Sequence, residues 1–228
     1  MPPSLQIEPI VVSPFEENCY LVWNADTKRG VIVDPGDEGD RIICRVKKIG
    51  FSPEAILITH GHGDHIGAIA QVKDEFKIPV YCGDGEEELL VDPTKNLTAW
   101  YGNPIAAPAP DFLVSEANGI EIAGFTFVIL STPGHSPASV SYLCGKTLFS
   151  GDVLFMGSIG RVDLLGADEA VMMRTLRDKI LTLADDVTVY PGHGPVTTIG
   201  RERQTNPFLL GIRAAGATNA SGGAIRRV

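Results

Sequence analysis

Every histidine of this chain lies in one of three short segments that are far apart in the sequence. The first segment, 59–65, reads THGHGDH, and the other two, 133–135 and 191–193, both read PGH. The chain has five histidines, so none remains for the surface or the core. With Asp64 and Asp152 they offer seven nitrogen- and oxygen-donor residues. That number is enough for two zinc-like ions at about four donors each, so the fold must bring the three segments together.

The spacing within the first segment favours metal binding in a loop. His60 and His62 are two residues apart, and on a helix they would not share a face. In an extended segment or a tight loop, both can reach one ion. Asp64 and His65 are adjacent, point elsewhere and can serve a second ion. The glycines between these residues permit backbone paths that branched residues would resist.

Candidate ligands follow predicted apolar strands. Strands are predicted at 55–59, 125–130, 146–150 and 187–190, just before His60, His135, Asp152 and His193. This arrangement is typical of a site built on loops at one edge of a sheet sandwich. Further strands are predicted at 5–12, 18–23, 30–33, 79–82, 120–122 and 139–143, and helices at 40–49, 66–76, 86–90, 94–101 and 168–183. We therefore expect two sheets with helices on their outer sides.

Length and composition fit a globular protein with a substantial core. The chain has 228 residues, of which 44% are hydrophobic. We expect one folded domain over residues 1–210, which contains all the candidate ligands. From 211 to 228 the sequence is rich in glycine and alanine, which predicts a loosely held C-terminal tail.

Charge and the N-terminal sequence restrict the partners and the compartment. The net charge of −9 argues against nucleic acid and anionic membrane surfaces as partners. Residues 1–8 contain no basic region followed by an apolar stretch, so no secretory signal is predicted, and no apolar run is long enough to span a membrane. We expect a cytoplasmic protein whose four cysteines are reduced. The sequence does not define an oligomeric state.

Four motifs together resemble the metallo-β-lactamase superfamily. They are THGHGDH at 59–65, TPGHSP at 132–137, SGD at 150–152 and PGH at 191–193, and their order and spacing cover about residues 5–208. Within the superfamily, the chain looks most like the type II glyoxalases, the hydroxyacylglutathione hydrolases. The resemblance implies an α/β fold, a four-layer αββα sandwich, and a centre of two divalent metal ions. Zinc is the expected metal, and iron and manganese also suit these ligands.

The resemblance also assigns a role to each candidate ligand. His60, His62 and His135 would hold the first ion, Asp64, His65 and His193 the second, and Asp152 would bridge both. Asp34, in the sequence VDPG, matches a position that supports the site without binding metal. The alternative for Asp34 is a plain turn residue, because Asp-Pro-Gly is a strong turn signal by itself.

These assignments predict a metal-dependent hydrolase, similar to type II glyoxalases, that acts on a small-molecule thioester. S-lactoylglutathione or a related hydroxyacyl thioester is the expected substrate, attacked by a hydroxide that the two ions share. Asp64 and Asp152 are the predicted catalytic residues, with Asp64 orienting the hydroxide. The superfamily's β-lactamases commonly have a cysteine at the position of Asp152, so antibiotic hydrolysis is not expected.

The substrate-binding residues are less well defined by the sequence. Only 35 residues follow His193 (228 − 193), too few for the C-terminal helical domain with which larger type II glyoxalases bind glutathione. Arg161 is the candidate for contact with an anionic substrate group. Its alternative is an ion pair with an acid such as Asp163.

Two other functions compete with hydrolysis. The stretch 160–163 also resembles the persulfide dioxygenases of the same superfamily, which would use a single iron bound by His60, His135 and Asp152. A metal-stabilised domain without enzymatic activity is the third possibility. Structural zinc sites are usually closed and rich in cysteine, and the histidine segments contain none, so this last possibility is disfavoured.

Overall fold

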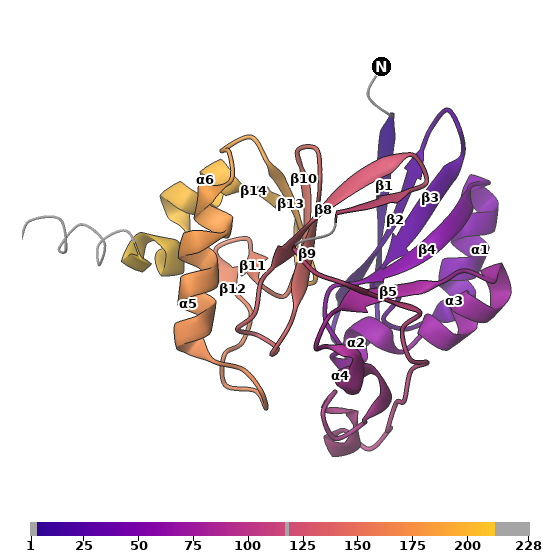
Figure 1. Ribbon diagram of the computed structural model, residues 1–228, viewed down its shortest axis with the longest axis horizontal. Helices are drawn as coiled ribbons and strands as arrows, with labels where there is room; N and C mark the ends of the chain where they lie inside the picture. The colour runs from indigo at the N-terminus through magenta and orange to yellow at the C-terminus, as the bar shows by residue number, and fades with distance from the viewer. Residues whose placement is uncertain (1–3, 117–118, 213–228) are drawn as a thin grey trace, which may run out of the picture.

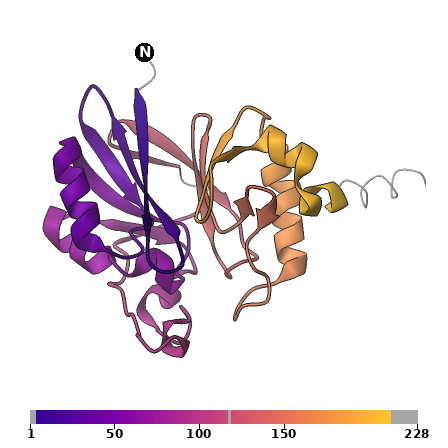
Figure 2. The same cartoon turned by 180° about the vertical axis from the view of Figure 1, so that it is seen from behind.

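Two six-stranded sheets lie face to face, and helices cover their outer sides, in the computed structural model, which describes residues 4–116 and 119–212 (Figure 1). The first half of the chain forms one sheet with its helices, and the second half forms the other (Figure 2). The predicted four-layer αββα sandwich is therefore confirmed. The predicted tail at 211–228 lies outside the described residues from 213 onward.

The first sheet is mixed, and its order follows the sequence from β1 to β6. Its strands are β1 (Leu5–Val12), β2 (Glu17–Asn24), β3 (Arg29–Val33), β4 (Ser52–Ile58), β5 (Val80–Gly83) and β6 (Phe112–Val114). β1, β2 and β3 pair antiparallel, and β3 to β6 pair parallel. The outer helices are α1 (Gly39–Ile49) and α3 (Ile69–Phe76). The carboxyl ends of β3, β4 and β5 therefore lie at the same edge.

The second sheet has the order β14-β13-β10-β9-β8-β7. Its strands are β7 (Ile120–Ile122), β8 (Phe125–Ser131), β9 (Val140–Cys144), β10 (Thr147–Gly151), β13 (Thr188–Pro191) and β14 (Thr197–Thr198). β10 and β13 pair parallel, and the other neighbours pair antiparallel. The outer helices are α5 (Glu169–Asp178) and α6 (Ile199–Thr205), and a small hairpin joins β11 (Leu154–Phe155) to β12 (Ser158–Ile159).

Four layers require three apolar interfaces, and the strands supply them by alternation. Side chains of successive strand residues point to opposite faces. In β4, Ile56 and Ile58 pack toward the outer helices, whereas Ala55 and Leu57 pack between the sheets. The third interface lies between the second sheet and its helices, where Met172 and Leu176 of α5 are fully buried. Strands buried on both faces read as continuous apolar runs, which is why AILI at 55–58 was recognisable.

Three helix predictions need correction. The predicted helix 66–76 is two pieces, α2 (Gly63–Ile66) and α3, and the predicted helix 168–183 ends at Asp178 and continues as the short 3₁₀ helix η2 (Ile180–Thr182). The helix predicted at 94–101 is wrong. Only η1 (Thr98–Trp100) forms there, because Leu97 has a left-handed backbone and Asn96 binds the backbone N–H and hydroxyl of Thr98 with its side-chain oxygen. The short strands β6, β11, β12 and β14 and the helix α6 were not predicted.

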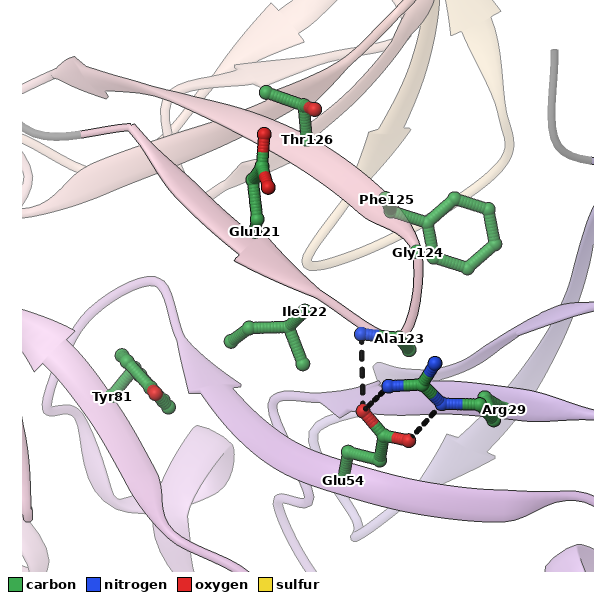
Figure 3. A pocket seen from close by; sticks show the side chains of 9 residues that line it. All are labelled: Arg29, Glu54, Tyr81, Glu121, Ile122, Ala123, Gly124, Phe125 and Thr126. Carbon is green, nitrogen blue, oxygen red and sulfur yellow. Dashed lines mark hydrogen bonds and ion pairs between the residues drawn. The ribbon is translucent and has the colours of Figure 1, made fainter.

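Glu54 links the two halves of the sandwich at the amino end of β4. Its carboxylate accepts hydrogen bonds from the Arg29 guanidinium and from the backbone N–H of Ala123, at 3.1 Å, in the β7–β8 hairpin (Figure 3). These groups line a pocket together with Tyr81 and Glu121. Because the histidines follow the carboxyl ends of the strands, this link lies at the edge opposite the candidate metal ligands.

No helix in the described part of the chain is long and apolar enough to cross a membrane.

Candidate metal centre

Loops from both sheets meet at one edge of the sandwich, as the sequence predicted. His60 lies two residues beyond β4, and the short helix α2 that carries Asp64 and His65 follows it. His135, Asp152 and His193 follow β8, β10 and β13 of the second sheet. The structure brings all seven predicted ligands together in overlapping groups.

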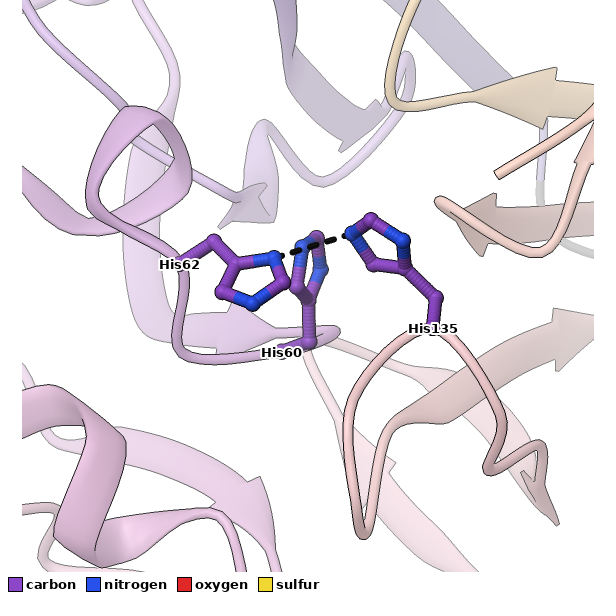
Figure 4. A group of neighbouring side chains, drawn as sticks. All are labelled: His60, His62 and His135. Carbon is purple, nitrogen blue, oxygen red and sulfur yellow. Dashed lines mark hydrogen bonds between the residues drawn. The ribbon is translucent and has the colours of Figure 1, made fainter. Parts of the chain in front are cut away.

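Three imidazoles form the first group. The rings of His60, His62 and His135 point toward one another from two loops (Figure 4). Nδ1 of His62 lies 2.9 Å from Nε2 of His135, and the ring centroid of His60 lies 4.8 Å and 4.9 Å from those of His62 and His135. All three side chains are buried. This group is the one predicted to hold the first ion.

The second group consists of Asp64, His65 and His193, and Asp152 lies between it and the first. Oδ2 of Asp64 is 3.3 Å from Nε2 of His193. Oδ1 of Asp152 is 3.4 Å from Nε2 of His65, and its Oδ2 is 3.4 Å from Nε2 of His135 and 3.5 Å from Nε2 of His193. Asp152 therefore contacts both groups, as the predicted bridging ligand must.

Unsatisfied atoms in the two groups fit bound metal ions. The buried atoms without a hydrogen-bond partner include Nε2 of His60 and His65 and Oδ1 of Asp152. Leaving a buried polar atom unpaired costs about 1–3 kcal/mol, so three such atoms at one place indicate a missing partner. Ligands about 2.0–2.1 Å from zinc at tetrahedral corners lie about 3.3–3.4 Å apart, close to the spacing of the donor atoms around Asp152. The residues present fit two divalent ions.

Hydrogen bonds to the other ring nitrogens orient the imidazoles. Nδ1 of His65 lies 3.1 Å from Oδ2 of Asp34, Nδ1 of His135 lies 2.8 Å from the carbonyl oxygen of Arg161, and Nδ1 of His193 lies 3.0 Å from that of Phe15. Since these acceptors are oxygens, each Nδ1 carries a proton, and Nε2 is the nitrogen that faces Asp152.

Asp34 connects β3 to this network. Its carboxylate accepts hydrogen bonds from the backbone N–H of Thr59 at 2.8 Å and from the hydroxyl of Thr59 at 2.6 Å, in addition to facing His65. Asp34 also has a positive φ of 46°, as a turn residue can. Asp34 is therefore both a turn residue and a support for the site, because the turn places its carboxylate behind the ligands.

Electrostatics keep three of the ligands, His60, His62 and Asp152, in their metal-binding forms. Burial lowers the pKa of His60 well below its usual value and, together with His135, lowers the pKa of His62 to about 3. Both imidazoles are therefore neutral at neutral pH. Burial opposes ionisation of Asp152, but the neighbouring histidines, His65 above all, outweigh it and hold its pKa well below the usual range. Neutral imidazole and ionised carboxylate are the forms that bind divalent cations.

Arg161 contributes a backbone group that the sequence could not reveal. Its guanidinium forms two hydrogen bonds of 2.9 Å with the carboxylate of Asp163, and 63% of its side chain is exposed. This is the ion pair that was the alternative to a substrate contact. The carbonyl oxygen of Arg161 meanwhile holds His135.

Sequence reasoning missed two groups next to the second ion position. Glu17 is fully buried, neither of its carboxylate oxygens has a hydrogen-bond partner, and Oε1 lies 3.7 Å from Nδ1 of His65. Phe15 holds His193 through its backbone carbonyl oxygen, and its aromatic ring is exposed and contacts Tyr101 edge-on at 5.6 Å between ring centroids. Neither position carries a sequence signal, because acidic and aromatic residues are common in such turns.

Comparisons with known proteins agree with this geometry. A family model described as the metallo-β-lactamase superfamily matches residues 12–193. The hydroxyacylglutathione hydrolase GloC of Haemophilus influenzae is 38% identical over 209 residues, which are 90% of this chain and 98% of that protein. The solved structure of a protein titled BLEG-1 B3 metallo-β-lactamase is 44% identical with a TM-score of 0.87, and the match covers 90% of this chain and 99% of that one. A structure titled TTHA1623 in a di-iron-bound form is 39% identical with a TM-score of 0.79 and covers 89% and 100% of the two chains.

Proposed function

Because this chain belongs to the metallo-β-lactamase superfamily, we propose that it is a binuclear metal-dependent hydrolase that cleaves a thioester. The first candidate substrate is S-lactoylglutathione or a related hydroxyacyl thioester. The observation that carries this proposal is the gathering of all seven ligands into two groups that share Asp152. The name of the H. influenzae relative supports the substrate class.

The two aspartates have different tasks in this proposal. When bound, two divalent ions supply a hydroxide at neutral pH and polarise the substrate carbonyl. Asp152 is nine-tenths buried and ionised, and it fixes the separation of the two groups of ligands. Asp64 is more exposed, at 20% against 9% for Asp152, so it is the carboxylate that can orient the incoming water and accept its proton.

The rim of the site offers both apolar and charged contacts. Phe15, whose carbonyl oxygen holds His193, and Tyr101, whose ring contacts that of Phe15, are 53% and 60% exposed. Large exposed apolar groups at a site favour contact with an apolar part of the substrate. Arg161 supplies the charge, next to His135. We propose that Arg161 exchanges Asp163 for an anionic group of the substrate.

The test is hydrolysis of thioesters by protein of known metal content. Protein loaded with zinc, iron or manganese is assayed with S-lactoylglutathione, other glutathione thioesters and thioesters of smaller thiols. We expect hydrolysis that requires about two ions per chain and disappears in His62→Ala. Turnover by the metal-free protein, or full activity of His62→Ala, would contradict the proposal.

β-Lactam hydrolysis is the second candidate. The sequence predicts against it, but the 44% identical structure is titled a B3 metallo-β-lactamase. The same metal-loaded protein is therefore assayed with a chromogenic cephalosporin. We expect kcat/KM for the thioester to exceed that for the cephalosporin, and the reverse order would replace the thioester proposal.

A persulfide dioxygenase with one iron is the third candidate. It would use His60, His135 and Asp152 and give the other four ligands no direct task, which is why we rank it below hydrolysis. Oxygen uptake with glutathione persulfide by the iron-loaded protein would favour it. The cellular setting we propose is the cytoplasm, without a nucleic-acid or membrane partner, supported by the net charge of −9.

A further inference from the structure

Glu86 is a fully buried carboxylate behind the first group of histidines. It lies in the turn between β5 and the short helix α4 (Glu87–Val91), and its backbone N–H donates to the carbonyl oxygen of Gly83 at 3.0 Å. None of the motifs that identify the superfamily in this sequence includes it. Burial raises the pKa of its carboxyl group, and hydrogen bonds from Ser136, Ala138 and Gly61 oppose that shift, so the carboxylate depends on neutral hydrogen-bond donors.

The donors to Glu86 come from the two loops that carry the first group of ligands. Oε2 accepts a hydrogen bond of 2.9 Å from the backbone N–H of Gly61, the residue between His60 and His62. Oε1 accepts hydrogen bonds of 2.7 Å from the hydroxyl of Ser136 and from the backbone N–H of Ala138, in the loop that begins at His135. One carboxylate therefore joins the loop after β4 of the first sheet to the loop after β8 of the second.

Packing holds this connection in one place. A Cβ at position 61 would overlap the Cβ of Leu89 in α4, so the helix that follows Glu86 lies directly against the first loop. Leu89 and Leu90 are buried beneath it. The carboxylate cannot move away without moving α4, and the two loops cannot separate without breaking hydrogen bonds to a buried acceptor.

We propose that Glu86 is a positioning residue that sets the distance between the His60–His62 loop and the His135 loop, and so sets the affinity of the first metal position. This inference rests on the proposed two-metal centre but does not depend on the substrate. All three hydrogen bonds of the carboxylate reach loops of the first group. The second position, at Asp64, His65 and His193, should therefore be much less sensitive to this residue.

Glu86→Gln keeps the side-chain shape but replaces one acceptor oxygen with a donor, so only one of the two loops keeps its hydrogen bonds. The amide oxygen can still accept from Ser136 and Ala138, but the amide N–H₂ then faces the N–H of Gly61, and two donors do not bond. Loss of a partner that orients metal ligands typically lowers metal affinity about 10–100-fold. We expect a loss of that size at the first position and a change below about 3-fold at the second.

The measurement is zinc affinity by competition with a chromophoric chelator, without substrate. Each position is isolated by removing a ligand of the other, with His193→Ala reporting the first position and His62→Ala the second. Glu86→Gln is introduced into both backgrounds and into the natural chain. Glu88→Gln is the matched control, because Glu88 lies two residues away, is 69% exposed and pairs with Lys95.

A large loss with His193→Ala and little loss with His62→Ala would support the positioning role. Unchanged affinity with His193→Ala, or equal losses in both backgrounds, would overturn it, since a general loss of stability would weaken both positions alike. If Glu86→Gln does not fold, Ser136→Ala removes one donor only, and we expect the same selectivity with a loss of about 3–10-fold. A selective loss together with no thioester hydrolysis by the natural chain would refute the proposed substrate and leave this inference standing.

Discussion

Oδ1 of Asp152 lies 3.4 Å from Nε2 of His65, and this contact joins the two sheets of the sandwich. Asp152 follows β10 of the second sheet, and His65 lies in α2, after β4 of the first. Both side chains are buried. The metal centre is therefore assembled across the interface between the halves, so its geometry reports on how the sheets pack.

Asp152→Asn tests the bridging role. An amide keeps the shape but loses the negative charge and one strong metal-binding oxygen, so it cannot serve both groups equally. We expect fewer than two zinc ions per chain by plasma emission spectroscopy and a loss of at least about 100-fold in thioesterase kcat/KM. Asp178→Asn is the control, because Asp178 is 51% exposed at the end of α5 and pairs with Arg177. Two tightly held ions in Asp152→Asn would refute the bridge.

The stability of the metal-free protein should fall with acid below about pH 6.5, because of His62. Its pKa is about 3 in the folded protein and about 6.5 when unfolded, so the unfolded chain binds more protons between these values. The stabilisation is complete above the unfolded pKa and is lost as the pH falls, by up to about 1.4 kcal/mol per pH unit.

Urea unfolding of the chelator-treated protein at several pH values measures this slope. Alanine has no ionisable side chain, so its burial has no pH-dependent cost. The free energy of unfolding of His62→Ala should therefore fall less steeply between pH 6.5 and 4 than that of the natural chain. His193→Ala is the comparison, because the pKa of His193 is raised by the hydrogen bond to Asp64 and by Asp152 against the effect of burial, which gives the opposite sign. An identical slope in the natural chain and His62→Ala would contradict the assignment.

The placement of the ligand loops at one edge of the sandwich could be predicted, because it follows from strand direction. AILIT at 55–59 and TVY at 188–190 are apolar runs that end directly before ligand motifs. Strands that run in the same direction carry their carboxyl ends to one edge, so residues 60 and 193 were expected at the same edge of the sandwich. The motifs then distinguished Asp64 and Asp152 from the other acidic residues of the chain.

The groups that orient the ligands could not be predicted in this way. The carbonyl oxygens of Phe15 and Arg161 hold His193 and His135, and every residue has such an oxygen, so no sequence pattern marks them. Glu86 reads as a surface acid in a GEEE run, and only the tertiary structure buries it. The helix expected at 94–101 failed for a related reason, because the Asn96 side chain competes with helical hydrogen bonding there.

Glu17→Gln should stabilise the metal-free protein at alkaline pH. Burial, only partly offset by His65, raises the pKa of Glu17 well above its usual value, so the folded state retains a proton that the unfolded chain releases above about pH 4.5. The stability that comes from this retained proton is therefore lost as the pH rises. An uncharged amide removes the dependence, and we expect a gain of about 1 kcal/mol at pH 8 that shrinks toward pH 5.

Urea unfolding at pH 5 and pH 8 compares Glu17→Gln with the natural chain. Glu16→Gln serves as the control, because Glu16 is exposed in the turn just before β2. A gain that is the same at both pH values would show that shape and not charge is responsible. A loss of stability at pH 8 would mean that Glu17 is ionised in the folded protein and makes a stabilising contact there.

Phe15→Ala should weaken substrate binding with little effect on the chemical step. The carbonyl oxygen that orients His193 belongs to the backbone and remains, whereas the exposed ring against Tyr101 is lost. Loss of one aromatic contact is worth about 0.5–1.5 kcal/mol, so we expect KM for the thioester to rise about 2–12-fold while kcat stays within about 2-fold. Steady-state kinetics of the zinc-loaded protein measure both constants, and Phe112→Ala is the matched control, because Phe112 is equally exposed, at 51%, on the edge strand β6. A fall in kcat at constant KM would show instead that the ring acts through His193, and unchanged kinetics would place the apolar part of the substrate elsewhere.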